Sequence, residues 1–353
     1  MNIFIQLIVY LSTYVSIFAM TYYLLGFLER ESSKSFQISR FPKVSVVIPA
    51  YNEEHTLLPT VESAIALEYP SSKLEIIIVD DGSKDSTLAL ARSIAKTHLQ
   101  VRVFTKPNGG KASAMNFGIA KARGEIIVSL DADSVVEKVA LRNMIPYFHD
   151  SLVMCVTPAM KVVKPKGRLQ RIQSVEYEIG VFLRKSFTKL NAVHVTPGPF
   201  SAYRKSFFLK YGGYDEHTVT EDMEIALRIQ KHHFRIENCL DAVVRTHSPK
   251  GFGELLKQRR RWYFGAIKNY VRYHSLFSRK YGEMGIFILP LSLFSVITTI
   301  FITFYYTGKV LSDYFHKLEL YSLIGFDFMH NFTFKWYTLS IVLYEAFTNG
   351  LIV

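Results

Sequence analysis

The apolar positions of this chain follow two different patterns, long runs at the ends and short runs in the middle. Residues 3–28 are almost uninterrupted Ile, Leu, Val, Phe, Tyr and small residues, with no charge before Glu29. An apolar helix of this length can span a bilayer. A cleaved signal peptide is the competing interpretation, but no basic region precedes the run and no small-residue cleavage site follows it. We therefore predict an uncleaved anchor over residues 1–30.

Two further apolar runs lie in the C-terminal part. The first covers about residues 285–307, with Pro290 near its start, and predicts a second span. The second covers about residues 336–353 and carries Glu345 and Asn349 without a basic flank, which leaves an incomplete span and an interfacial helix as alternatives. We assign residues 284–353 to a C-terminal transmembrane region.

Between these runs, short apolar segments alternate with helical patterns. The apolar segments are predicted strands at residues 44–48, 74–79, 100–105 and 125–130. Helical patterns follow the first three, beginning near Glu53, Lys84 and Lys111. Short runs buried on both faces are typical of a parallel sheet that helices cover. The alternation predicts an α/β domain over residues 41–250.

Polar motifs follow the predicted strands. Ligands of open α/β sheets bind at the carboxyl ends of strands, and Asp80-Asp81 and Asp131-Ala132-Asp133 stand at two such ends. No GxGxxG or Walker loop follows a strand, which argues against a nicotinamide or P-loop site. Asp131 and Asp133 are two residues apart, so both side chains can face one divalent cation. The alternative for this pair is an Asx-rich turn.

The charge and composition of the chain favour contact with a membrane surface. The 353 residues hold 42 Lys+Arg and 30 Asp+Glu, a net charge of +12, with 14% aromatic residues and a mean hydropathy of +0.14. No nucleic-acid-binding module is recognisable, so the basic charge and the apolar ends favour a bilayer over nucleic acid. Lys and Arg concentrate between Arg30 and Lys280, which places this region in the cytoplasm and the sequon at Asn331 outside. Cys155 and Cys239 have no CxxC partner and imply neither a disulfide nor a zinc site.

Four strings occur in order: Asp80-Asp81, Asp131-Ala132-Asp133, Thr220-Glu221-Asp222 and Gln258-Arg259-Arg260-Arg261-Trp262. In this order and at these intervals they resemble the signature of the membrane-bound, inverting family 2 glycosyltransferases, the group of the cellulose, chitin and hyaluronan synthases. The resemblance covers about residues 44–262. It implies a GT-A fold, a nucleoside-diphosphate sugar as donor, and Mn²⁺ or Mg²⁺ held by Asp131 and Asp133 on the donor diphosphate.

The same resemblance implies the remaining donor contacts. Tyr51 is expected on the nucleotide base, Glu53 with Asp80 or Asp81 on base or ribose, and Lys111 near the phosphates. The full implied donor set is Pro49, Tyr51, Glu53, Asp80, Asp81, Lys111, Asp131, Asp133 and Arg261. Plainer explanations stay open: Tyr51 in the core, Glu53 at a helix N-terminus, and Asn108-Gly109-Gly110 as an ordinary turn that leaves Lys111 in solvent.

Inverting transfer needs a base that takes the proton of the acceptor hydroxyl, and we choose Asp222. The alternative is a helix start, with Thr220 as N-cap and an acidic first turn. The acceptor residues that the resemblance implies are Gly198, Glu221, Gln258 and Trp262. On a helix, Gln258, Arg261 and Trp262 share one face because they stand at i, i+3 and i+4.

Lipid contact is a second interpretation of the same helices. Residues 251–283 carry the QRRRW string within a basic amphipathic pattern, and residues 168–190 form a second predicted interfacial helix. The chain lacks the FxVTxK gating loop of bacterial cellulose synthase, and its two or three spans are few for a polymer channel. We therefore predict sugar transfer to a glycan or lipid-linked acceptor at the cytoplasmic face of the cell membrane.

Two other functions stay as alternatives. A polyprenyl-phosphate sugar transferase is disfavoured because that branch lacks the QRRRW string. An inactive membrane scaffold that retains the fold is disfavoured by the intact carboxylates Asp131, Asp133 and Asp222.

Overall fold

The computed structural model describes residues 3–28 and 40–324. The third predicted span and the sequon at Asn331 lie outside the described residues. The chain divides into two compact units, one formed by Met1–Tyr22 with Phe287–Val353 and the other by Tyr23–Ile286. The four-part division expected from the sequence stays a prediction.

The first unit consists of apolar helices. Helix α1 covers Ile3–Leu28 and helix α10 covers Leu289–Ile324. Within them, Ile5–Gly26 and Met284–Leu320 are long and apolar enough to cross a membrane. Helix α10 is longer than the predicted second span, because no proline interrupts the chain after Pro290 and helix-forming residues continue past Thr307.

The second unit is built around one eight-stranded sheet with the strand order β3-β2-β1-β4-β7-β6-β8-β5. The strands are β1 (Val44–Ala50), β2 (Leu74–Asp80), β3 (Val101–Thr105), β4 (Ile126–Ser129), β5 (Val135–Val136), β6 (Val153–Val162), β7 (Ala202–Arg204) and β8 (Arg235–Thr246). Strands β1 to β4 pair in parallel, as the sequence predicts. Strand β7 is antiparallel to both β4 and β6, and β8 runs parallel to β6. The carboxyl ends of β1, β2, β4, β6 and β8 therefore all face one edge of the sheet.

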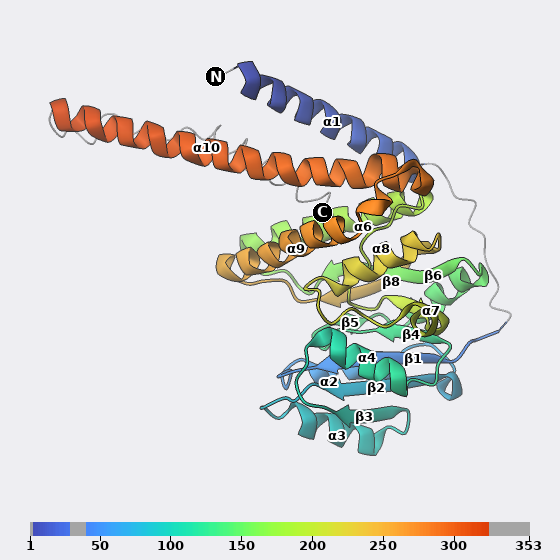
Figure 1. The fold of residues 1–353 in the computed structure, drawn as a ribbon. Coiled ribbons are helices and arrows are strands. Elements are labelled where there is room, and N and C mark those ends of the chain that lie inside the picture. Colours follow the sequence, from blue (N-terminus) through green and yellow to red (C-terminus); the bar gives the residue numbers. More distant parts are fainter. Residues whose placement is uncertain (1–2, 29–39, 325–353) are drawn as a thin grey trace. The chain divides into compact units, whose positions relative to one another are not determined.

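Helices cover this sheet on both faces. The described α-helices of the unit, after the end of α1, are α2 (Leu57–Ile65), α3 (Thr87–Thr97), α4 (Lys111–Lys121), α5 (Ala140–Met144), α6 (Gly167–Lys189), α7 (Lys205–Tyr211), α8 (Glu221–Lys231) and α9 (Phe252–Arg272). Buried residues of α2, α3 and α5 share a core with Val46 and Ile48 of β1. Helix α4 packs on the other face, where Gly118 lies so close to Val47 that a Cβ would clash at 2.3 Å. Figure 1 shows α6, α8 and α9 gathered beside the β6 and β8 half.

Candidate active site

The carboxyl edge of the sheet collects the residues of the DxD and TED strings. Lys111, the first residue of α4, connects them. Its Nζ lies 2.6 Å from Asp131 Oδ1 and 3.6 Å from Glu221 Oε1. Desolvation disfavours the charged form of Lys111, yet the carboxylates of Asp131 and Glu221 outweigh it and raise the pKa of the ammonium. The Lys111 side chain is 37% exposed, so it reaches solvent as the plainer alternative has it, but it is also ion-paired with the site carboxylates.

Asp131, Asp133 and Glu53 lie close enough for their charges to affect one another. Burial, followed by the nearby charge of Asp131, raises the pKa of Asp133. Burial also raises the pKa of Glu53, and the charges of Asp133 and Asp131 add to the shift. Mutual repulsion of this kind indicates more negative charge than the neighbouring cations balance.

A divalent cation fits this surplus. Carboxylate oxygens suit Mg²⁺ and Mn²⁺, which often complete their coordination with water and substrate phosphates. Among residues 3–28 and 40–324, no three His, Cys, Asp or Glu side chains are arranged to hold a metal by themselves. Asp131 and Asp133 are therefore suited to hold a cation that also binds an incoming diphosphate.

The loop before β7, which contains Gly198, packs closely against the Lys111–Asp131 ion pair. The carbonyl of Gly198 accepts a hydrogen bond from Ser129 Oγ at 2.6 Å. A Cβ on Gly198 would lie 2.6 Å from Lys111 Nζ and 3.1 Å from Asp131 Oδ2, so only glycine leaves the ion pair undisturbed. Two residues later, buried Phe200 adopts a φ of 61°, a left-handed conformation that costs free energy for a bulky side chain. Strain held against a charged cluster is typical of functional loops.

Asp222 lies in the first turn of α8. Its half-buried carboxylate accepts the backbone N–H of Met223 at 2.9 Å. Burial raises the pKa of Asp222 to about 6, and the neighbouring Glu221 adds to the shift, while the charges of Lys111 and Arg261 oppose it. A carboxylate with this pKa accepts a proton more readily at neutral pH than an ordinary aspartate.

Buried contacts fix the backbone around Asp222. Thr196 donates to the Asp222 carbonyl through both Oγ1, at 2.8 Å, and N, at 3.2 Å. Thr220 occupies the N-cap position of α8 but makes no side-chain cap bond. Its Oγ1 instead accepts from Asn269 Nδ2 of α9 at 3.0 Å, and a Cβ on Gly265 would clash with the same threonine at 2.2 Å. The expected helix start is correct, but Thr220 connects α8 to α9 instead of capping α8.

Asp80 and Asp81 are both buried and already bonded. Asp80 accepts from Thr105 Oγ1 at 2.8 Å, and Asp81 accepts from Lys106 Nζ at 2.8 Å. Asp81 also accepts the backbone N–H of Gly110 at 2.8 Å, so it holds the turn from which α4 and Lys111 start. The turn predicted at 108–110 is thus present, and it positions a site residue. Donor binding by either aspartate stays a prediction.

The other predicted donor residues lie where β1 ends. Pro49 is the next-to-last residue of β1, and Tyr51 follows the strand with 44% of its surface exposed. The alternative that placed Tyr51 in the core is therefore wrong. The Glu53 backbone carbonyl accepts from the N–H groups of Thr56 and Leu57, so Glu53 also stands at the start of α2.

Helix α9 carries the QRRRW string, as the spacing predicts. Gln258 and Trp262 are half-buried, and Arg261 is exposed while its charge lowers the pKa of Asp222. Arg259 forms an ion pair with Glu176 of α6, and its guanidinium lies 4.5 Å from the Trp262 ring centroid. The helix face therefore reaches the Asp222 side of the site. Donor and acceptor contacts of these residues stay predictions.

Two residues near the site were absent from the sequence prediction. His247 directly follows β8, whose carboxyl end faces the same edge as Asp133, and the charge of His247 opposes the raised pKa of Asp133. Tyr177 of α6 feels the charge of Asp133. His247 could have been predicted as a site residue from its place directly after a strand, once β8 is recognised. Tyr177 could not, because it reaches the site only through tertiary packing.

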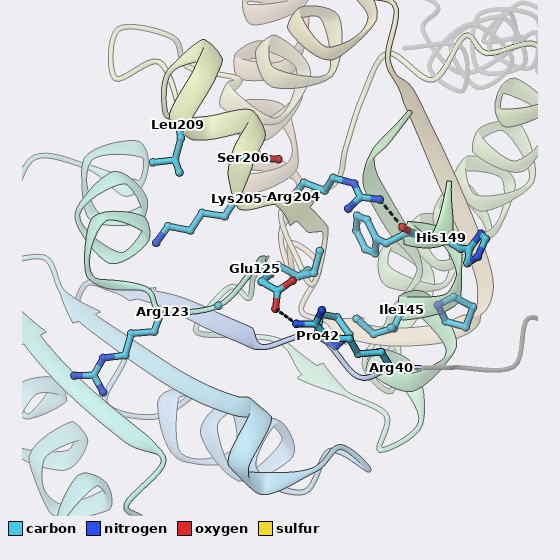
Figure 2. A pocket seen from close by; sticks show the side chains of 14 residues that line it. Arg40, Pro42, Arg123, Glu125, Ile145, His149, Arg204, Lys205, Ser206 and Leu209 are labelled. Carbon is cyan, nitrogen blue, oxygen red and sulfur yellow. Dashed lines mark hydrogen bonds and ion pairs between the residues drawn. The ribbon is translucent and has the colours of Figure 1, made fainter. Parts of the chain in front are cut away.

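A pocket of about 610 Å³ lies elsewhere on the same unit (Figure 2). It is lined by the segments before β1 and β4, the turn at 145–149 and the start of α7, which places it at the opposite edge of the sheet. Arg204 and Lys205 contribute cationic side chains, but both already donate to backbone carbonyls. The predicted site residues do not line this pocket.

Comparison with known proteins agrees with the geometry of the carboxyl edge. Residues 45–212 match the sequence model of glycosyl transferase family 2. The chain is 32% identical over 269 residues to the poly-beta-1,6-N-acetyl-D-glucosamine synthase of Staphylococcus aureus, covering 75% of this chain and 64% of that relative. The synthase of the same name from Staphylococcus epidermidis is 29% identical over 320 residues, covering 88% of this chain and 74% of the relative.

A solved structure shares the fold at lower sequence identity. The mannosyltransferase PcManGT from Pyrobaculum calidifontis, in complex with GDP-Man and Mn²⁺, superposes with a TM-score of 0.69 at 20% identity, covering 98% of this chain and 97% of that chain. The chain carries a family 2 glycosyltransferase domain with a GT-A fold, as the sequence motifs implied. Its named relatives are synthases of an N-acetylglucosamine polysaccharide.

Proposed function

We propose that the chain is a metal-dependent inverting glycosyltransferase. It moves a sugar from a nucleoside-diphosphate sugar to a hydroxyl of a glycan or lipid-linked acceptor at the cytoplasmic membrane face. The contact of Lys111 with both Asp131 and Glu221 carries this proposal, because it brings the predicted donor end and the predicted base onto one site. The name of the staphylococcal relatives makes an N-acetylglucosaminyl donor the first to test.

The residues divide the work between leaving group and nucleophile. Asp131 and Asp133 hold Mn²⁺ or Mg²⁺, which offsets the charge that grows on the departing diphosphate. Lys111 and Arg261 add positive charge on the same side. Asp222 takes the proton of the acceptor hydroxyl while that hydroxyl attacks from the opposite face of the anomeric carbon. Gly198, Glu221, Gln258 and Trp262 border the acceptor.

A donor screen tests this function. The full chain in detergent is supplied with UDP- and GDP-sugars and Mn²⁺, and release of the nucleoside diphosphate is measured with and without acceptor saccharides. We expect release that depends on the divalent ion and on Asp222, with Asp241→Asn as a matched control because Asp241 is an exposed aspartate. The anomeric configuration of the product, read by NMR, should be inverted. No release with any donor would instead support the inactive scaffold.

The membrane part of the proposal rests on α1, α10 and the distribution of Lys and Arg. An anchor at 1–30, a catalytic domain at 41–250, interfacial helices at 251–283 and a membrane region at 284–353 would keep the site beside cytoplasmic sugar nucleotides. Single cysteines introduced at Asn2 and Asn331 should then react with an impermeant thiol reagent from outside intact cells. A cysteine at Lys84 should react only after lysis, and the opposite pattern would reverse the topology.

A further inference from the structure

One face of α6 carries polar residues to which the proposed chemistry assigns no role. Gln173, Tyr177, Gly180 and Arg184 stand at i, i+4, i+7 and i+11, so they line one face of the helix. Gln173 is 1% exposed and Tyr177 is 8% exposed. Burial raises the pKa of the Tyr177 phenol, and the charge of Asp133 contributes in the same direction. The middle of this face therefore lies within electrostatic reach of the proposed metal site.

Arg184 carries a positive charge that no described residue balances. Its Nε and Nη2 are buried and make no hydrogen bond within the described part of the chain. Burial lowers the pKa of the guanidinium to about 10. Buried polar groups are almost always hydrogen-bonded, and a buried charge without a partner is costly. The arrangement is therefore that of a binding residue whose anion is supplied by a ligand.

Contacts two and three residues beyond Arg184 join α6 to Tyr23 of α1. Two residues later, Ser186 Oγ donates to the Tyr23 carbonyl at 3.1 Å, and the Phe187 and Tyr23 rings are 5.1 Å apart. Tyr23 lies near the end of the apolar stretch Ile5–Gly26. If α1 spans the bilayer as proposed, its end marks the boundary between hydrocarbon and headgroups. Lipid phosphates lie at this level.

We propose that Arg184 binds the phosphate of a lipid-linked saccharide acceptor, an inference that rests on the proposed function. The planar guanidinium matches a phosphate with two parallel hydrogen bonds. Arg184 follows Tyr177 by about two helical turns, or about 10.5 Å along α6. Tyr177 is the residue of this face that feels the charge of Asp133, so the phosphate would be held about two helical turns away from the level of the proposed metal site. In this proposal the reacting hydroxyl belongs to a sugar beyond the phosphate, and the phosphate oxygen is not the nucleophile.

Gln258 of α9 adds a polar group beside Tyr177. A hydrogen bond from Gln258 opposes the raised pKa of Tyr177, while the buried Oε1 of Gln258 has no partner among the described residues. That oxygen can accept a sugar hydroxyl. The α6 face and Gln258 together would hold the acceptor from its phosphate to its reactive end.

A pair of acceptors tests the role of Arg184. One is a short-chain polyprenyl diphosphate that carries the acceptor saccharide, and the other carries the same saccharide on the lipid alcohol without phosphate. With the full chain in phospholipid-free detergent, kcat/KM should favour the phosphorylated acceptor. Arg184→Gln should reduce this preference by a factor on the order of 10–100, the worth of a hydrogen bond to a charged group. Arg184→Lys, which keeps the charge and loses the planar fork, should retain part of it.

Controls separate this inference from the proposed function. Arg171→Gln removes an exposed arginine of the same helix and should keep the full preference. An unchanged preference in Arg184→Gln overturns the role of Arg184 even if transfer and donor hydrolysis are normal. Loss of binding to phosphatidylglycerol vesicles, with the acceptor preference intact, would assign Arg184 to a membrane headgroup and also overturn it. Absence of Mn²⁺-dependent donor hydrolysis in the unaltered chain would instead remove the proposed function.

Discussion

The two edges of the central sheet differ in how their charges are balanced. At the amino edge, Arg204 and Lys205 line the 610 Å³ pocket (Figure 2). Arg204 donates to the carbonyls of Val153 and Asp150 at 2.9 and 3.0 Å, and Lys205 donates to that of Ala122 at 2.6 Å. At the carboxyl edge, burial raises the pKa values of Asp133 and Glu53, and the negative charges of the neighbouring carboxylates add to both shifts.

This difference in hydrogen bonding and charge distinguishes the pocket at the amino edge from the reactive site at the carboxyl edge. Polar groups with complete partners stabilise the fold and have little left for a ligand. Several carboxylates beside one lysine repel one another, and binding a cation or a proton relieves this repulsion. Perturbed pKa values of this kind are typical of active-site groups. The pocket and the charged site therefore lie at opposite edges of the same sheet.

The largest effect should come from removing the metal or its ligand at the carboxyl edge. Asp133→Asn, or chelation of the unaltered chain with EDTA, should abolish sugar transfer because the leaving diphosphate loses its counter-charge. Added Mn²⁺ should restore the chelated chain and leave the variant inactive. Transfer kinetics with a radiolabelled donor measure this, with circular dichroism to check the fold. Full turnover in EDTA would contradict the surplus-charge interpretation.

Next in size is the loss of the base. Asp222→Asn should lower the chemical rate by a factor on the order of 10²–10⁴ while donor affinity stays close to normal, because the change removes proton transfer and keeps the shape. Single-turnover rates and nucleotide titration measure the two quantities. A collapse of donor affinity would make Asp222 a donor ligand or a structural residue. The exposed Asp241→Asn should change neither quantity.

The carboxyl edge of the parallel strands β1, β2 and β4 can be predicted largely from the sequence. Strands β1, β2 and β4 are runs of Val and Ile that the sheet buries on both faces, so their ends, and the acidic motifs after them, are visible without coordinates. The half with mixed parallel and antiparallel pairing is harder to predict. Strand β7 has three residues, and the β6 and β8 pairing shifts register at Pro158, so no run of uniform pattern marks them.

The residues that position the site residues could not be predicted from the sequence either. Thr196 and Asn269 fix Asp222 and Thr220 from segments far away in the sequence, through hydrogen bonds that only the folded chain creates. The family resemblance implied Lys111 as a donor residue, whereas its place after a glycine turn alone allowed an ordinary solvent-exposed lysine. Its position between Asp131 and Glu221 was not predictable, since that depends on how α4 and α8 pack.

A third effect concerns pH. The raised pKa of Asp222, about 6 against an ordinary 3.8, means that the base is protonated below pH 6. The rate should then fall about tenfold per pH unit on the acid side. The folded state binds this proton more tightly than the unfolded state, so the same group adds stability as pH falls from about 6 towards 3.8.

Activity and stability should therefore move in opposite directions through this group, and the comparison of kcat/KM with the free energy of unfolding across pH 4.5–7 measures both. In the Asp222→Asn variant, the residual kcat/KM should no longer fall at acidic pH. A fall that persists in the variant would assign the titration to another carboxylate of the cluster.

The smallest effect on activity should come from the amino edge. Arg204→Met removes the donor for the carbonyls of Val153 and Asp150, and an unpaired buried acceptor costs about 1–3 kcal/mol. The free energy of unfolding in denaturant should fall by about this amount, while the transfer rate per folded molecule stays unchanged. Arg123→Met on the rim of the same pocket, where the arginine is exposed, should change stability by less than about 0.5 kcal/mol. If Arg204→Met instead abolished transfer in a stably folded chain, the amino edge would contribute to the chemistry, and the division between a structural and a reactive edge would be wrong.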